Sequence, residues 1–223
     1  MTRSGNTPRS YLRPYHDAAA QHGPTFGALL WRNRDFQTLR FDVLAREARL
    51  AGRAVADLGC GTGDMLRRLV EAGQPPRSYV GVEGIASLAQ RARAHTASAG
   101  VASVEILEAD FVADERFFEK LVRQHGVDAM VFSGSLNTLS ERLARRTLER
   151  AWRGVERSRD GVLAFNFLAS EFRGAPTDDH GPAKRFSCAR LLAWAMKKTD
   201  RVVLRTDYLD GHDATIVMFV PSA

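Results

Sequence analysis

Three glycines stand at alternate positions in one short turn, with carboxylates on both sides of them. The stretch VADLGCGTGD places Gly59, Gly61 and Gly63 between Asp57 and Asp64. An apolar run precedes the turn and a helical pattern follows it, so the glycines lie where a strand passes into a helix. Glycine there permits a positive φ or lets a bound molecule approach bare backbone. The turn is therefore a candidate ligand site.

The spacing of the glycines differs from two common phosphate-binding turns. A dinucleotide site carries Gly-x-Gly-x-x-Gly, but here the third glycine comes one residue early and Asp64 holds the last place. A Walker loop needs Gly-Lys-Ser/Thr, which the turn lacks. Asp57 would repel a pyrophosphate and favours a cationic group such as an ammonium. The turn therefore indicates a nucleoside that carries positive charge, and Cys60 within it is interpreted as a small residue, not a nucleophile.

Two further carboxylates follow the next two predicted strands. Glu83 ends SYVGVE, at a distance from the turn where an acidic side chain can accept from both ribose hydroxyls. Asp110, in EILEADF, can accept from an exocyclic amine, with Phe111 beside an adenine ring. One such acid alone is more often a helix cap than a ligand. Because parallel strands end at one edge of a sheet, three acids at successive strand ends predict one shared site.

Strand-like and helix-like patterns alternate along the chain after residue 50. Strands are predicted at 54–58, 78–83, 104–107, 128–132 and 161–167. Helices are predicted at 64–72, 86–98, 114–124 and 141–157. This alternation predicts an α/β fold, with a parallel sheet and helices on both faces. The C-terminal part of the chain differs from this alternation. There a helical pattern is followed by two apolar segments around an Asp-Gly turn, and these predict a hairpin with an antiparallel strand.

The N-terminal segment lies outside this alternation. Residues 1 to about 10 are polar and are expected to form a loose arm, and helical patterns follow near 15–21 and 35–49. We therefore expect two parts, an arm with a helical lid over 1–50 and a binding domain over 51–223.

Composition limits the classes of function. The chain has 223 residues and a net charge of +6, which fits a nucleic-acid partner or an arginine-rich solvated surface. Two cysteines give no disulfide framework, and no zinc spacing or other metal site is expected. No secretory signal and no apolar run of membrane-spanning length is present, so we expect a cytoplasmic protein without membrane contact.

Four motifs together resemble a known family. ADLGCGTGD, GVEG, LEADF and VFSGSLN are similar to the ordered motifs of class I S-adenosylmethionine-dependent methyltransferases, and the resemblance covers roughly 50–220. It implies a Rossmann-like, seven-stranded, mostly parallel sheet with one antiparallel strand, an N-terminal helical lid, and S-adenosylmethionine as cofactor. VEGIAS departs from the pattern, since many members have a small polar residue where this chain has Gly84.

The resemblance also implies which residues hold each part of the cofactor. Glu83 is expected at the ribose, and Asp110 and Phe111 at the adenine, with Ile85 on the adenine side. Trp31 and an arginine, Arg32 or Arg40, are expected near the cofactor's carboxylate, although Trp31 fits equally a role in docking its helix on the sheet. The residues expected at the methionine part or beneath the cofactor are Asp57, Gly59, Cys60, Gly61, Gly63, Gly84, Ser133 and Gly134.

Methyl transfer needs alignment of the reacting atoms more than a dedicated base. Asn137 is expected near the transferred methyl group, or as the N-cap of the next helix. His180, in the polar loop that also holds Asp178 and Asp179, is the first candidate for a base. The predicted catalytic residues are His180, Asn137 and Tyr15, and the predicted substrate residues are Tyr11, Tyr15, Asn137, Asn166 and His180. His95, His125 and His212 are expected at the surface.

The leading interpretation is a methyltransferase that acts on N or O of a small-molecule metabolite, as a monomer or homodimer. An RNA- or ribosome-directed methyltransferase is the alternative, which the net charge of +6 favours. A cofactor-binding protein without catalysis is a third interpretation. An NAD-dependent enzyme is opposed by Asp57 and Asp64.

Overall fold

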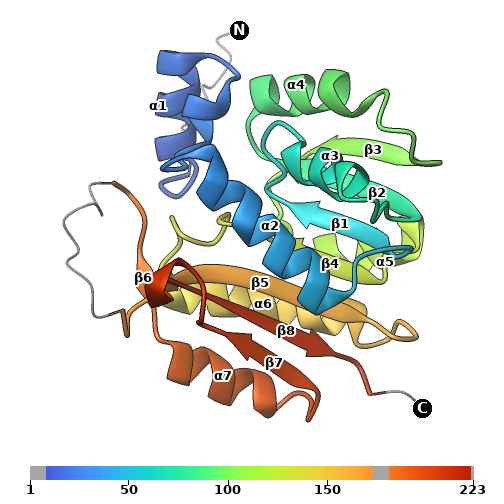
Figure 1. Ribbon diagram of the computed structural model, residues 1–223, viewed down its shortest axis with the longest axis vertical. Coiled ribbons are helices and arrows are strands. Elements are labelled where there is room, and N and C mark those ends of the chain that lie inside the picture. Colours follow the sequence, from blue (N-terminus) through green and yellow to red (C-terminus); the bar gives the residue numbers. More distant parts are fainter. Residues whose placement is uncertain (1–8, 173–180, 222–223) are drawn as a thin grey trace, which may run out of the picture.

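The computed structural model describes residues 9–172 and 181–221 and shows one twisted sheet between two layers of helices (Figure 1). The sheet has eight strands, of which seven follow the order β3-β2-β1-β4-β5-β8-β7. Strand β8 runs antiparallel to both of its neighbours, and the other pairs are parallel. The predicted mostly parallel sheet with one antiparallel strand is therefore confirmed.

The predicted strand segments all form strands. The bounds are β1 Ala54–Leu58, β2 Ser78–Glu83, β3 Val104–Glu108, β4 Ala129–Phe132, β5 Val162–Ala169, β6 Arg185–Phe186, β7 Val202–Arg205 and β8 Asp213–Phe219. The eighth strand, β6, pairs with the end of β5 and was missed because two residues show no periodicity. The terminal hairpin is present, but its connection is longer than a tight Asp-Gly turn and includes the 3-10 turn η2 Leu209–Gly211.

The helices divide between the two faces of the sheet, as predicted. They are α1 Arg13–His22, α2 Arg34–Ala48, α3 Asp64–Glu71, α4 Ala86–Thr96, α5 Phe117–His125, α6 Glu141–Val155 and α7 Cys188–Met196. Leu44 of α2, Leu66 of α3 and Ala89 of α4 join one core cluster. Phe118 of α5 and Trp152 of α6 join the other. Alternate residues of each strand enter opposite clusters, which is the strand period of two.

The N-terminal segment contributes to two different layers. Helix α2 packs into the core, where Phe41 and Leu44 are buried against the sheet. Helix α1 and the 3-10 turn η1 Phe26–Leu29 instead form a small separate cluster, in which Leu12 and Tyr15 contact Ile85 and Leu88. These two elements therefore lie over the ends of the strands rather than in the core. No helix among the described residues is long and apolar enough to span a membrane.

Candidate active site

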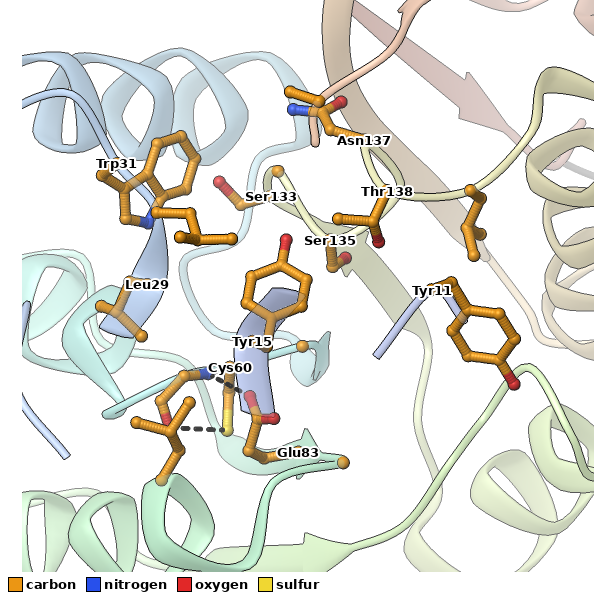
Figure 2. Close-up of a pocket in the computed structure, with 18 of the residues that line it drawn as sticks. Tyr11, Tyr15, Leu29, Trp31, Cys60, Glu83, Ser133, Ser135, Asn137 and Thr138 are labelled. Atoms are coloured by element: carbon orange, nitrogen blue, oxygen red, sulfur yellow. Dashed lines mark hydrogen bonds between the residues drawn. The ribbon is translucent and has the colours of Figure 1, made fainter. Parts of the chain in front are cut away.

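A cavity of about 420 Å³ lies at the carboxyl ends of β1, β2 and β4, within the size range of small-molecule and cofactor sites (Figure 2). Its roof comes from α1, η1 and the start of α2. Most residues predicted for cofactor or substrate line it: Tyr11, Tyr15, Trp31, Arg32, Arg40, Asp57, Gly59, Cys60, Gly61, Glu83, Gly84, Asp110, Phe111, Ser133, Gly134 and Asn137. The structure therefore gathers residues that are far apart in the sequence around one cavity.

The three glycines of the turn are required for different reasons. A Cβ on Gly59 would lie 2.4 Å from Cβ of Ser135, and one on Gly61 would lie 2.7 Å from Cδ2 of Leu29. Gly63, the N-cap of α3, differs because its Cβ would meet Thr96 of α4 at 2.6 Å and it does not line the cavity. The small size of Gly63 therefore lets α3 approach α4, and its contact with the cofactor stays a prediction.

Glu83 is fixed by the backbone around it. Its Oε2 accepts from the N–H of Gly61 at 2.9 Å, and its Oε1 accepts from the N–H of Ile85 at 2.9 Å. Burial raises the pKa of this carboxyl to about 7, although the backbone hydrogen bonds act in the opposite direction. Each carboxylate oxygen retains a further lone pair, so the group can still accept hydrogen bonds from a ligand.

Asp57 is held by a residue that the sequence analysis did not single out. The hydroxyl of Tyr79 donates to Asp57 Oδ2 at 2.6 Å, and both side chains are buried. A Cβ on Gly81 would lie 2.6 Å from Ile106, 2.8 Å from Cys60 and 3.2 Å from Cε1 of Tyr79, so the missing side chain makes room for all three. Burial raises the pKa of Asp57 to about 7, while the hydrogen bond from Tyr79 lowers it. The signal for Tyr79 was its period-two spacing from Gly81 and Glu83 in SYVGVE.

Asp110 is held from both sides at the β3 end of the cavity. Its Oδ1 accepts from the N–H groups of Val112 and Ala113, and its Oδ2 accepts from the hydroxyl of Tyr11 at 2.7 Å. Burial and then the hydrogen bond to Asp110 raise the pKa of Tyr11 to about 12. Tyr11 therefore lies with the residues predicted for the adenine, rather than with those predicted for a substrate. Phe111 lines the cavity, and its ring packs edge-on against Phe132.

Tyr15 stands in the middle of the cavity, between Glu83 and the loop after β4 (Figure 2). Burial and the charge of Glu83 raise the pKa of its phenol above the ordinary value, while a hydrogen bond with Thr138 lowers it. At neutral pH the phenol is protonated, so it can donate a hydrogen bond but cannot take a proton from a substrate.

Trp31 and Arg40 form one wall of the cavity. The guanidinium carbon of Arg40 lies 4.8 Å from the centre of the Trp31 ring, and a Cβ on Gly134 would meet Cη2 of that ring at 2.6 Å. Arg40 Nε and Nη2 each donate to Asp213 at 2.6 Å, and both residues are buried. Two of the three guanidinium nitrogens are thus engaged within the protein.

Two asparagines predicted for the substrate have different surroundings. Asn166 is buried away from the cavity, where its Oδ1 accepts from the N–H of Gly134 and its Nδ2 donates to Ser133. Asn166 therefore holds the loop after β4, and its contact with the substrate stays a prediction. Asn137 lines the cavity, and its buried Oδ1 has no hydrogen-bond partner among the described residues. Ser140, not Asn137, is the N-cap of α6.

Two other predicted positions do not line the cavity. The side chain of Ile85 packs in the small cluster with Ala28 and Leu88, and its contact with the adenine stays a prediction. The predicted base His180, with Asp178 and Asp179, lies outside the described residues. No group of three or more potential metal ligands occurs among the residues that the structure describes.

His212 was predicted at the surface, but it lines the cavity. Its Nδ1 lies 2.7 Å from Oδ2 of Asp213, and its side chain is 22% exposed. The hairpin position suggested an exposed tip, but the connection folds back so that η2 ends at the cavity. The adjacent His-Asp pair in DGHD was the one signal that could have identified it.

Comparisons with known proteins bear on the fold and on one segment of the chain. Residues 55–158 match a family model described as a methyltransferase domain. Magnesium protoporphyrin IX methyltransferase from Synechocystis PCC 6803, solved with bound S-adenosylhomocysteine, is 13% identical with a TM-score of 0.64, over 96% of this chain and all of that one. The S-adenosylmethionine-dependent methyltransferase SibL is 17% identical with a TM-score of 0.65, over 94% of this chain and 62% of that one.

A structure of a small RNA methyltransferase is also similar, at 14% identity and a TM-score of 0.62, over 84% of this chain and 25% of that one. No curated protein matches the sequence. The matched family model begins in β1 and includes the glycine turn and the ends of β2 and β4. Residues 55–158 therefore match a methyltransferase domain, and the chain has the class I fold that S-adenosylmethionine-dependent methyltransferases share.

Proposed function

We propose that the chain binds S-adenosylmethionine in this cavity and methylates N or O of a small molecule. The main observation behind this proposal is that α1 and η1 cover the cavity on the side of the glycine turn. Leu29 of η1 lies so close to Gly61 that a Cβ added there would be 2.7 Å from Cδ2 of Leu29. A partly covered cavity lined by aromatic rings fits a small planar acceptor better than a base within a folded RNA.

The residues present fit this cofactor. Asp57 and Glu83 offer acceptors at fixed positions, and neither forms an ion pair with a described residue. When bound, S-adenosylmethionine supplies a methyl group on a positively charged sulfur. The two carboxylates bind its ammonium and ribose hydroxyls in this proposal, while Asp110 and Phe111 contact the adenine. The bare backbone of Gly59 and Gly61 forms the floor beneath them.

The protein's own contribution to the reaction is orientation and exclusion of water. Trp31 and Tyr15 enclose the centre of the cavity, and Asn137 offers a buried acceptor to an N–H or O–H of the substrate. A buried acceptor without a partner costs about 1–3 kcal/mol, so its retention supports a role in holding a donor. Such positioning brings a nucleophile into line with the methyl group.

Calorimetric titration tests the first half of this proposal. We expect S-adenosylmethionine and S-adenosylhomocysteine to bind with a stoichiometry of one, and NAD not to bind. Incubation with methyl-labelled cofactor and either a metabolite extract or total RNA tests the second half. Label in the metabolite fraction supports a small-molecule acceptor. Binding without transfer to either fraction would contradict the enzymatic proposal.

A second candidate function is methylation of RNA, and one observation favours it. Beside the glycine turn, a second cavity is lined by four basic residues and one acidic residue, Arg34, Arg67, Arg91, His95 and Asp64. A cluster of this kind can contact phosphates of a nucleic acid. Salt-dependent RNA retention that falls in the variant R67Q/R91Q, together with label in the RNA fraction, would favour this function over the first.

A further inference from the structure

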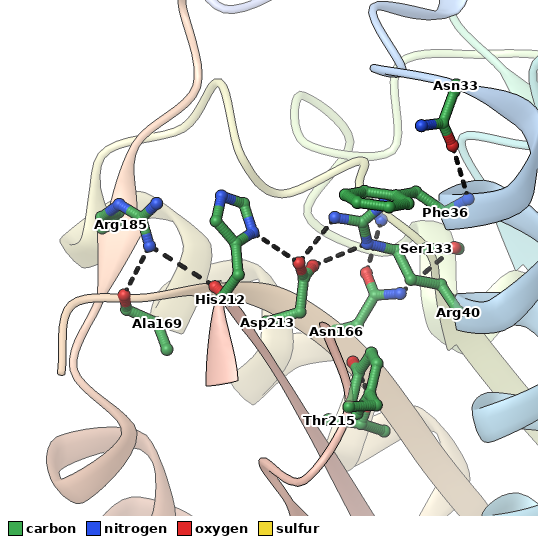
Figure 3. A network of polar contacts seen from close by, with 12 residues as sticks. Asn33, Phe36, Arg40, Ser133, Asn166, Ala169, Arg185, His212, Asp213 and Thr215 are labelled. Carbon is green, nitrogen blue, oxygen red and sulfur yellow. Dashed lines mark hydrogen bonds and ion pairs between the residues drawn. The ribbon is translucent and has the colours of Figure 1, made fainter. Parts of the chain in front are cut away.

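A charged network lies at the start of β8, where two of its members, Arg40 and His212, line the cavity (Figure 3). His212, at the start of β8, shares a short hydrogen bond with Asp213, at 2.7 Å between Nδ1 and Oδ2. Asp213 also receives two hydrogen bonds from Arg40 of α2, at 2.6 Å each. Asp213 is only 1% exposed, whereas His212 lies at the cavity wall. The carboxylate is thus inside the protein and the imidazole is at the surface of the cavity.

The network determines which nitrogen of His212 carries the proton. Burial acts to raise the pKa of Asp213, but the hydrogen bonds from His212 and Arg40 outweigh it and hold that pKa below its ordinary value. Asp213 is therefore ionised and can only accept hydrogen bonds. The hydrogen between the two residues must lie on Nδ1 of His212. In the neutral ring, Nε2 then has the lone pair and is the proton acceptor.

The rest of the surroundings keep the imidazole in place. The ring packs edge-on against Phe172, with centroids 5.1 Å apart. Arg185 donates to the carbonyl oxygens of His212 and Ala169, which ties the start of β8 to the end of β5. Among these contacts, Asp213 bonds to the imidazole itself, Arg40 bonds to Asp213, and Arg185 bonds to the backbone oxygen of His212. One side chain has a fixed tautomer and a fixed orientation on the wall of a binding cavity.

We propose that His212 takes the proton of the substrate's nucleophile, with Asp213 as the positioning residue that sets its tautomer. The proposal rests on the methyltransferase function proposed above, and it narrows the acceptor to a group with a proton to lose, a hydroxyl or an N–H. The nucleophile's electron pair forms the new bond to the methyl carbon, and sulfur keeps the pair of the broken bond. The N–H or O–H proton passes to Nε2 of His212, and bulk water later receives it.

Imidazole NMR tests the tautomer without any substrate. In the ¹⁵N-labelled protein with S-adenosylhomocysteine at pH 8, the signals lost in H212Q identify His212. We expect the Nδ1–H tautomer, with its population lowered in the variant D213N. An Nε2–H tautomer in the wild type would overturn the proposal, whether or not the protein transfers methyl groups.

Kinetics test the role of the proton acceptor. With methyl-labelled cofactor and a metabolite extract, H212Q should lower the rate of label transfer by about 10²- to 10⁴-fold. Its affinity for S-adenosylhomocysteine should stay within twofold of the wild type. H125Q, a histidine paired with Glu105 outside the cavity, is the matched control and should keep the wild-type rate.

The two failures are distinguishable. Equal rates and equal pH profiles in H212Q and the wild type would overturn the proton-transfer proposal while methyl transfer stands. A wild-type protein that binds no cofactor would contradict the proposed function instead, and the NMR result would still decide the tautomer. For Asp213, a merely structural role predicts lower stability with an unchanged pH profile of the rate. A positioning role predicts a shifted profile in D213N.

Discussion

The two ends of the cavity hold their buried carboxylates in different ways. At the ends of β1 and β2, Asp57 and Glu83 receive hydrogen bonds from a phenol and from backbone N–H groups. Neither forms an ion pair with any residue that the structure describes. At the start of β8, Asp213 is paired with Arg40 and with His212. The first end thus has negative groups without cations, and the second has its charge balanced internally.

This difference separates binding from proton transfer. Burial raises the pKa of Asp57 and of Glu83 to about 7, whereas the partners of Asp213 hold its pKa below the ordinary value. A ligand with a positive charge and hydroxyl donors would complete the first end. The second end needs no ligand to fix its ionisation. We infer that the first end recognises the cofactor and the second acts on the substrate.

The largest effect is expected from removing the cation that pairs with Asp213. R40M leaves the carboxylate of Asp213 buried without its main cation, which costs about 3–5 kcal/mol of unfolding free energy. The matched control is R68M, because Arg68 binds Asp42 with the same two-bond geometry at 2.7 and 2.8 Å but both side chains are about one third exposed. That exposed pair should contribute at most about 1 kcal/mol. Equal losses in chemical denaturation would contradict the comparison.

At the end of the cavity with Asp57 and Glu83, loss of a charge should change cofactor affinity more than protein stability. D57N keeps an acceptor for the hydroxyl of Tyr79 but removes the charge, so S-adenosylmethionine affinity should fall by about 100-fold, or about 3 kcal/mol. D64N is the control, since Asp64 accepts from Thr62 beside the turn but does not line the cavity. Calorimetry that finds both variants within threefold of the wild type would remove Asp57 from the site.

Most of the fold follows from period and turn chemistry in the sequence. The strand at 54–58 and the helix that begins at Asp64 were predictable because a buried strand, a glycine turn and an amphipathic helix each have strong local patterns. The carboxylates at strand ends followed from the rule that parallel strands end at one edge. Glu83 and Asp57 therefore could be placed near each other without coordinates.

What could not be predicted depends on contacts between distant segments. Gly63 and Asn166 resemble ligand residues in the sequence, but the first makes room for α4 and the second holds the loop after β4. Arg40 and Asp213 are 173 residues apart, so their pairing has no local signal. His212 was assigned to an exposed tip because the length of a hairpin connection shows nothing of the direction in which it folds.

The glycine turn offers a third test, of close approach rather than charge. G61A places a Cβ 2.7 Å from Leu29 at a φ of +56°, so the roof must shift, and cofactor affinity should fall by about 30-fold. G73A is the matched control, because its φ is +69° and nothing lies within 4 Å of the added Cβ. Both variants should lose about 1 kcal/mol of stability to the strained φ, but only G61A should lose affinity.

The pH dependence of the two ends should differ in sign. Asp57 and Glu83 bind protons more readily folded than unfolded, so they stabilise the fold fully below about pH 4, and this contribution declines as the pH rises toward 7. Asp213 has a lowered pKa, so its contribution is present above about pH 4 and is lost on further acidification.

Binding of a cation requires the ionised forms of Asp57 and Glu83. S-adenosylmethionine affinity should therefore rise about tenfold between pH 6 and pH 8, measured by calorimetry. D57N should reduce this slope. An affinity that falls over the same interval would contradict the assignment of the first end.

The smallest effect is expected from Tyr79, and it decides whether this phenol positions Asp57 or only fills the core. Y79F keeps the buried ring but removes the donor 2.6 Å from Asp57 Oδ2. Because that hydrogen bond lowers the pKa of Asp57, its loss should move the midpoint of the affinity–pH curve upward. At pH 7 the affinity should fall by about threefold, and at pH 9 it should return to the wild-type value, since Asp57 is then ionised in both proteins. If the ring only fills the core, the midpoint of the affinity–pH curve should not move. If the loss of affinity persists at pH 9, Tyr79 sets the orientation of the Asp57 carboxylate rather than its ionisation.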